Sequence, residues 1–74
     1  MAPGATRTME LKATKYELRE HGIATITLNK PQRNNGWTGR MHTEYRHLLQ
    51  RAEDDPAVRV IVVTGEGKSF CVGA

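Results

Sequence analysis

The sequence has 74 residues, of which 38% are hydrophobic and 5% aromatic, and its net charge is +3 at pH 7. A chain of this length forms at most one small domain and buries only about 60% of its unfolded surface. No apolar run approaches the roughly 20 residues of a membrane span, and the N-terminus lacks the apolar segment of a secretory signal. The few aromatic residues and the dispersed basic residues argue against a nucleic-acid-binding surface.

The cysteine and histidine residues predict neither a disulfide nor a metal site. Cys71 is the single cysteine, which fits a reducing environment and favours a cytoplasmic protein. It has no base nearby in the sequence, so a small buried side chain is favoured over a nucleophile. His42 and His47 are five residues apart and point to different faces of a helix, while His21 belongs to a turn.

The first half of the chain predicts a leader followed by a β-hairpin. Residues 1–13 show no hydrophobic periodicity, so we expect a loose leader and a folded unit over residues 14–74. Residues 16–20 alternate between apolar and polar side chains, as a half-buried strand does. His21-Gly22 then provides a tight turn, and residues 23–28 form the second strand.

A loop and a helix follow the hairpin. Residues 29–36 are expected to form the loop, since Pro31 keeps the residue before it out of the helical region and turn-forming residues come next. Thr38 is the expected N-cap of the helix, which ends before Pro56. The helix carries one apolar stripe at helical spacing. This stripe consists of Met41, Tyr45, Leu48, Leu49 and Ala52. Glu44 falls on the polar side of this pattern, which predicts a surface ion pair with Arg40.

The segment from Val58 to Val63 predicts a buried strand. Val60 to Val63 is an unbroken run of four β-branched residues, and such a run is apolar on both faces, as in parallel sheets covered on two sides. A helix between two parallel strands makes a right-handed crossover. The predicted order of hairpin, helix and strand is therefore an α/β architecture. Most of the cover that the strand needs is absent from the sequence, so we expect a truncated chain.

The glycine-rich segment after this strand superficially fits a phosphate-binding P-loop. That motif needs a glycine five residues before Gly67, where the sequence has Val62. The helix that should follow Lys68 is not predicted either. A glycine turn at the end of a strand explains the same residues.

Five segments occur in a characteristic order and spacing. They are Ile23–Pro31, Asn35–Trp37, the amphipathic helix, Asp55–Gly65 and Lys68–Ala74. This combination resembles the crotonase (enoyl-CoA hydratase/isomerase) superfamily, and within it the opening portion of bacterial enoyl-CoA hydratases, over about residues 15 to 74. The resemblance implies the opening unit of a crotonase-type ββα spiral fold, which in the family continues beyond Ala74. Gly36 is a departure, because the family usually has alanine after the asparagine.

The resemblance also implies the role of one residue in catalysis. By position, Ala74 supplies one backbone N–H of an oxyanion hole, which stabilises negative charge on the thioester oxygen as an enolate forms. The second donor and the catalytic glutamates lie further along in the family. Several glutamates of this chain do not match them, namely Glu17, Glu20, Glu44, Glu53 and Glu66. The chain alone is therefore expected to be inactive.

The resemblance implies five positions that bind coenzyme A. Lys68 matches a basic position near the phosphates, and the backbone of Val72 lies along the adenine and pantetheine. Gln32 and Gly36 border the adenosine end. Gly73 has no Cβ that would obstruct the ligand.

The activity implied by the resemblance is hydration of a 2-trans-enoyl-CoA to a 3-hydroxyacyl-CoA in fatty-acid metabolism. The substrate is an acyl-CoA thioester, no separate cofactor or metal is expected because CoA is part of the substrate, and the parent enzyme is expected to be a homo-trimer or hexamer. An enoyl-CoA isomerase or another crotonase chemistry is the alternative enzyme. A non-catalytic gene remnant, or a piece that complements a C-terminal chain, is the alternative from another class.

Overall fold

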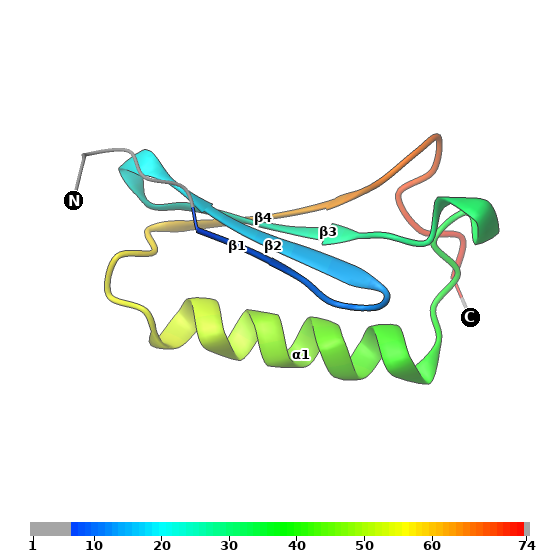
Figure 1. Ribbon diagram of the computed structural model, residues 1–74, viewed down its shortest axis with the longest axis horizontal. Helices are drawn as coiled ribbons and strands as arrows, with labels where there is room; N and C mark the ends of the chain where they lie inside the picture. Colours follow the sequence, from blue (N-terminus) through cyan, green and yellow to red (C-terminus); the bar gives the residue numbers. More distant parts are fainter. Residues whose placement is uncertain (1–6, 74) are drawn as a thin grey trace.

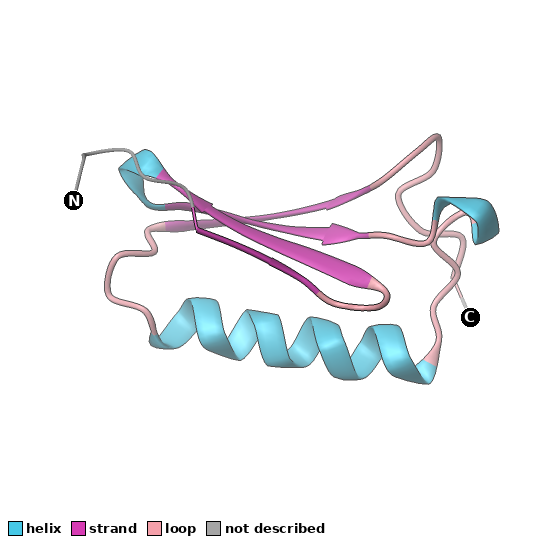
Figure 2. Cartoon of the chain, in the orientation of Figure 1, coloured by secondary structure: helices cyan, strands magenta, loops and turns pink. Residues whose placement is uncertain are grey.

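The computed structural model describes residues 7–73, which form a four-stranded sheet with one long helix along one of its faces (Figures 1 and 2). Short 3₁₀ turns occupy Glu20–Gly22 and Pro31–Arg33. The strands and the helix, in chain order, are β1 (Arg7–Glu10), β2 (Thr14–Arg19), β3 (Ile23–Leu28), α1 (Gly39–Asp54) and β4 (Val60–Gly65).

The sheet is mixed, and its strands lie in chain order. Strands β1, β2 and β3 pair antiparallel, whereas β3 and β4 pair parallel, from Ile23 opposite Val60 to Leu28 opposite Gly65. Helix α1 makes the connection between the two parallel strands. The α/β unit of hairpin, helix and strand predicted from the sequence is therefore confirmed.

The region expected to be a loose leader contains a strand. Arg7–Glu10 forms β1, which pairs with β2 from Arg7 opposite Leu18 to Glu10 opposite Lys15. The expectation for residues 1–13 is wrong for these four residues, because cross-strand pairing rather than a local hydrophobic pattern holds them in place. Residues 1–6 lie outside the described part of the chain.

The core lies between the sheet and α1. Tyr16 and Leu18 of β2 and Ala24 and Ile26 of β3 all belong to it, so the period-two alternation predicted for both strands is correct. The helix presents its apolar stripe to them, and its buried stripe residues are Met41, Leu48 and Ala52. The hydroxyl of Thr38 accepts a hydrogen bond from the backbone N–H of Met41 at 3.2 Å, which confirms the predicted N-cap.

Strand β4 is covered on one face by the described residues. Ile61 and Val63 pack against the core, whereas Val60 and Val62 on the opposite face are 53% and 42% exposed. Helix α1 lies on one face of the sheet only, as Figure 2 shows. The predicted strand is present, but it begins at Val60 rather than Val58 and none of its residues is fully buried. The expectation of a buried strand is wrong for the described residues, because its second face meets no other described element.

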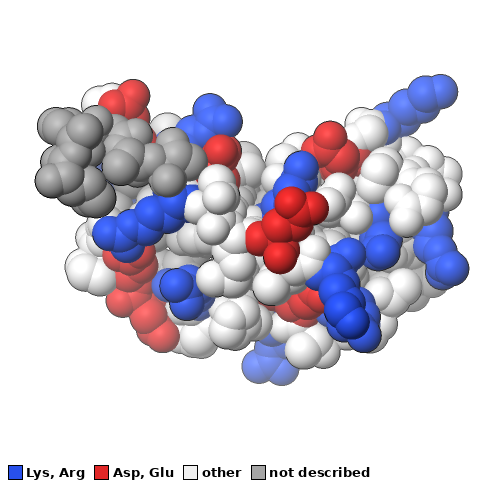
Figure 3. All heavy atoms as spheres, in the orientation of Figure 1, with Lys and Arg blue, Asp and Glu red and all other residues white. Residues whose placement is uncertain are grey.

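Charged side chains are interspersed on the surface. On the face drawn in Figure 3, basic and acidic residues are mixed over the left and centre, and basic residues predominate toward the right-hand end. Among residues 7–73, no helix combines the length and the apolar character that crossing a bilayer requires.

The buried position of Glu44 corrects the sequence-based expectation. Its Oε1 accepts hydrogen bonds from the backbone N–H of Ala13 and the hydroxyl of Thr14, each at 2.8 Å. Its Oε2 lies 3.9 Å from Nη1 of Arg40, so the predicted partner is present but the surface location is wrong. The start of β2 passes over the first turns of α1 and supplies two donors that need an acceptor there.

Replacing Glu44 tests this role. The substitution Glu44→Ala leaves two buried donors without an acceptor, which should lower the free energy of unfolding by about 3 kcal/mol. Urea unfolding followed by circular dichroism measures the loss. Glu53→Ala, on the exposed side of the same helix, is the matched control and should change stability by less than about 0.5 kcal/mol. Equal losses in the two variants would contradict the assigned role.

Candidate functional site

The residues assigned to coenzyme A lie on two loops at one edge of the sheet. One loop follows β3 and the other follows β4, and Figure 1 shows both at the end of the molecule where these strands finish. Because β3 and β4 are parallel, their carboxyl ends meet at the same edge. This edge is the usual place for ligands in α/β sheets.

Backbone contacts hold the two loops side by side. The N–H of Trp37 donates to the carbonyl of Gly73 at 2.8 Å, and the N–H of Glu66 donates to the carbonyl of Leu28 at 2.8 Å. A methyl group placed on Gly36 would lie 3.7 Å from the Gly73 oxygen and 3.9 Å from Cγ2 of Val72. Residues far apart in the sequence are therefore neighbours here.

The turn after β4 depends on a glycine. Gly67 has a φ of +86°, and a methyl group placed on it would lie 2.8 Å from Cβ of Pro31. Both the left-handed backbone and the close approach of the other loop exclude a side chain. No helix follows this turn in the described residues, which agrees with rejection of a P-loop.

The structure brings three of the five predicted binding residues together. Gly36 lies on the loop that the Trp37–Gly73 hydrogen bond holds beside Val72 and Gly73, and Val72 is 61% exposed. Gly73 has a φ of +92°, so the backbone itself favours glycine there. Gln32 and Lys68 are exposed on the flanking turns and make no side-chain hydrogen bond among the described residues. Ala74, the predicted oxyanion donor, lies outside the described residues.

Sequence reasoning missed the residue that joins the loops. Asn35 is fully buried, and its Oδ1 accepts from the N–H of Lys30 at 2.7 Å while its Nδ2 donates to the carbonyls of Glu66 at 2.9 Å and Ser69 at 2.7 Å. The sequence identified it as a turn residue, which its φ of +57° bears out, and as part of the Asn35–Trp37 segment, but not as a link between the loops. Its contacts with residues more than thirty positions away leave no local signal.

An apolar recess of about 270 Å³ borders these loops. The rings of Trp37 and Tyr45 meet edge to face there, with centroids 5.7 Å apart, and Phe70 is 57% exposed. Cys71 is half-buried against the same cluster, rather than fully buried as predicted. The full lining is Leu28, Trp37, Tyr45, Val63, Phe70 and Cys71.

Comparison with known proteins identifies the family. A family model described as Enoyl-CoA hydratase/isomerase matches residues 18–74. The chain belongs to this family. The fold agrees, since the structure superimposes on the crystal structure of an enoyl-CoA hydratase from Mycobacterium marinum with a TM-score of 0.82 and 44% identity, covering 84% of this chain and 31% of that one.

Two curated relatives place the chain within the family. A Mycobacterium tuberculosis protein named "Probable enoyl-CoA hydratase EchA14" is 52% identical over 52 residues, which is 70% of this chain and 20% of the relative. An Escherichia coli protein named 1,2-epoxyphenylacetyl-CoA isomerase is 39% identical over 54 residues, which is 73% of this chain and 21% of the relative. The chain thus spans about a fifth of the length of these relatives.

Two neighbouring asparagines provide a test of the loop junction. Asn34 and Asn35 both have a positive φ, so alanine at either position meets the same left-handed strain of about 1–2 kcal/mol. Asn35→Ala also removes three hydrogen bonds and should lower the free energy of unfolding by about 2–3 kcal/mol more than Asn34→Ala does. Urea unfolding measures this difference. Equal effects of the two substitutions would show that the buried amide does not hold the loops.

Proposed function

We propose that this chain forms one wall of the acyl-CoA site of an enoyl-CoA hydratase, which converts a 2-trans-enoyl-CoA to a 3-hydroxyacyl-CoA in fatty-acid metabolism. The observation that carries the proposal is the 2.8 Å hydrogen bond from the N–H of Trp37 to the carbonyl of Gly73, which holds the loop of Gly36 beside Val72 and Gly73 at the carboxyl ends of two parallel strands. It joins the two segments that the family resemblance assigns to coenzyme A. The match of residues 18–74 to the family model supports this resemblance.

In this proposal the backbone binds the thioester and the side chains bind the phosphates. The N–H of Ala74 is one donor of the oxyanion hole, and it acts by stabilising the charge that grows on the thioester oxygen. Gly73 precedes this donor, and its φ of +92° is a backbone conformation that favours glycine. Lys68 is exposed and free to approach a phosphate as a mobile positive charge.

General acid–base chemistry requires groups other than those assigned here. Among the glutamates, Glu44 is occupied by Ala13 and Thr14, and Glu66 lies 3.5 Å from the ammonium group of Lys15. The proposed parent enzyme supplies its catalytic carboxylates elsewhere, needs no separate cofactor, and works as a trimer or hexamer in the cytoplasm. The single cysteine, Cys71, supports that reducing location.

An isomerase is the second candidate. The Escherichia coli relative at 39% identity is named an isomerase, and oxyanion stabilisation by backbone donors serves isomerisation and hydration equally. The relative with the higher identity is named a hydratase, which favours hydration. A non-catalytic remnant or a complementing piece has no such observation in its favour.

A chimera tests the proposed activity. In the chimera, residues 18–74 of this chain replace the corresponding segment of the Mycobacterium tuberculosis relative. Hydration of crotonyl-CoA is then measured. We expect kcat/KM within about tenfold of the parent, a change of about 1.4 kcal/mol in transition-state stabilisation. The same chimera with Gly73→Val should lose most activity, and the 74-residue chain alone should show none. A correctly assembled chimera without turnover would contradict the proposal.

Binding of acetoacetyl-CoA to the 74-residue chain tests the wall itself. A site with one wall buries little of the ligand, so we expect a Kd of about 1 mM, near −4 kcal/mol. Calorimetric titration should show that Lys68→Ala binds the ligand more weakly and that Arg59→Ala binds it unchanged. Arg59 is the control because it precedes β4, whereas Lys68 follows that strand. Micromolar binding, or equal effects of both substitutions, would contradict the proposed wall.

A further inference from the structure

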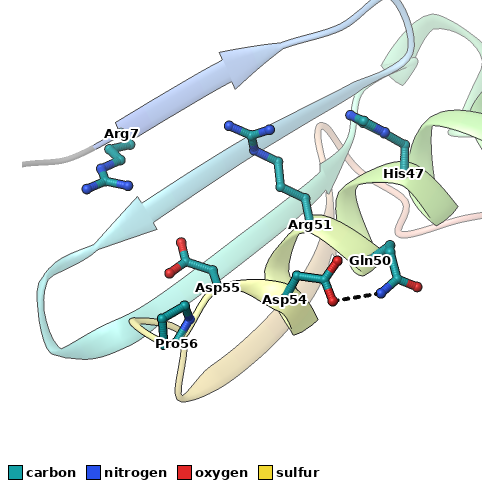
Figure 4. Close-up of a pocket in the computed structure, with 7 residues that line it drawn as sticks. All are labelled: Arg7, His47, Gln50, Arg51, Asp54, Asp55 and Pro56. Atoms are coloured by element: carbon teal, nitrogen blue, oxygen red, sulfur yellow. Dashed lines mark hydrogen bonds between the residues drawn. The ribbon is translucent and has the colours of Figure 1, made fainter.

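A second recessed region lies at the opposite end of α1 from the two loops. It is a groove of about 540 Å³ between β1 and the last turns of the helix. Figure 4 shows Arg7 on β1 and Arg51 on α1 with their guanidinium groups in this space, and Asp55 with its carboxylate directed toward it. The groove shares no lining residue with the proposed acyl-CoA site, so the two are separate surfaces.

A buried hydroxyl without a partner reaches the same region. Tyr16 is 5% exposed, and its hydroxyl oxygen has no hydrogen-bond partner among the described residues. Tyr16 lines a small recess of about 60 Å³ together with Arg7, Arg51 and Asp55, which also line the groove. Recess and groove are therefore contiguous, and a buried polar group that lacks a partner is costly in free energy.

The titration of Tyr16 agrees with this placement. Burial raises the pKa of the Tyr16 hydroxyl above its ordinary value, the charge of Asp55 raises it further, and Arg51 and Arg7 lower it. All three charged groups therefore act on the hydroxyl. The hydroxyl remains protonated at neutral pH and is available as a donor.

The donors around the recess are unpaired, whereas each nearby carboxylate already accepts one hydrogen bond. Neither Arg7 nor Arg51 forms an ion pair within residues 7–73. By contrast, Asp54 accepts a hydrogen bond from Nε2 of Gln50 at 3.0 Å, drawn dashed in Figure 4, and Asp55 accepts one from the N–H of Ala57 at 2.9 Å. Two guanidinium groups and a phenol thus face one space, and among the described residues none of the three is paired with an acceptor.

We propose that this groove binds a ligand through a carboxylate, which accepts a hydrogen bond from Tyr16 and pairs with Arg7 and Arg51. A planar carboxylate matches the fork of donors that a guanidinium presents. A group with one negative charge suits the site better than a phosphate dianion, because Asp54 and Asp55 repel additional charge. The small recess receives the carboxylate, and the wider groove receives the rest of the ligand.

Acetate is the probe that tests this site. The ¹⁵N-labelled chain is titrated with sodium acetate at pH 7, with ionic strength held constant by sodium chloride, and amide shifts are followed by NMR. We expect saturable shifts at Arg7, Tyr16 and Arg51, with binding about tenfold weaker in Tyr16→Phe. Tyr45→Phe, which removes the other tyrosine hydroxyl, is the matched control and should bind as the unmodified chain does.

Two further measurements keep the test decisive. The Tyr16→Phe variant should fold at least as well as the unmodified chain, because it removes an unpartnered buried group. Its Tm should be the same in acetate and chloride, whereas that of the unmodified chain should be higher in acetate. Arg51→Gln should weaken binding and Arg46→Gln should not. Absent or unsaturable shifts, equal binding by Tyr16→Phe, or tighter binding of phosphate than of acetate would overturn the proposal.

Discussion

The side-chain amide of Asn35 is the interaction on which the candidate site depends. It is buried and saturated, with its oxygen on the N–H of Lys30 and its nitrogen on the carbonyls of Glu66 and Ser69. These partners are backbone groups of two loops, so their hydrogen bonds to Asn35 are not part of a strand ladder or a helix. A buried backbone carbonyl needs a donor, and a single amide provides two donors and one acceptor at once. The path of both loops is thereby fixed before any ligand binds, which lowers the entropy cost of binding.

One glycine near this amide follows from the same constraint. Once Asn35 draws the turn after β4 toward the loop after β3, the space at Gly67 becomes too small for a side chain, because a methyl group there would meet Pro31. The position where the family usually has alanine is not crowded in the same way, because a methyl group on Gly36 would meet its neighbours at 3.5 Å or more. The glycine of this chain therefore leaves space open without being required by the packing.

The elements that the sequence predicted correctly are those with a local signal. The helix has a repeating apolar stripe and a Thr38 cap, and β3 alternates over its whole length, so pattern and propensity agree there. Strand β1 is short and exists through its pairing with β2, which no local pattern encodes. Glu44 was misplaced for a related reason. Its partners Ala13 and Thr14 precede it by about thirty residues, and a helical pattern that treats every charge as exposed cannot detect them. Within the site, Gly36, Val72 and Gly73 came from resemblance, while Asn35 needed the tertiary structure.

Two polar side chains buried between the sheet and α1 differ in whether the fold itself explains their burial. Glu44 and Tyr16 are both buried between the sheet and α1. The carboxylate of Glu44 has donors from β2 and an arginine nearby, so its burial is fully explained by folding. The hydroxyl of Tyr16 has no such explanation, since phenylalanine would fill the same apolar space without an unpaired donor. A residue that serves the fold alone is expected to pack well and to have its polar groups hydrogen-bonded. A buried hydroxyl beside two unpaired guanidinium groups breaks that rule, and a ligand with an acceptor restores it.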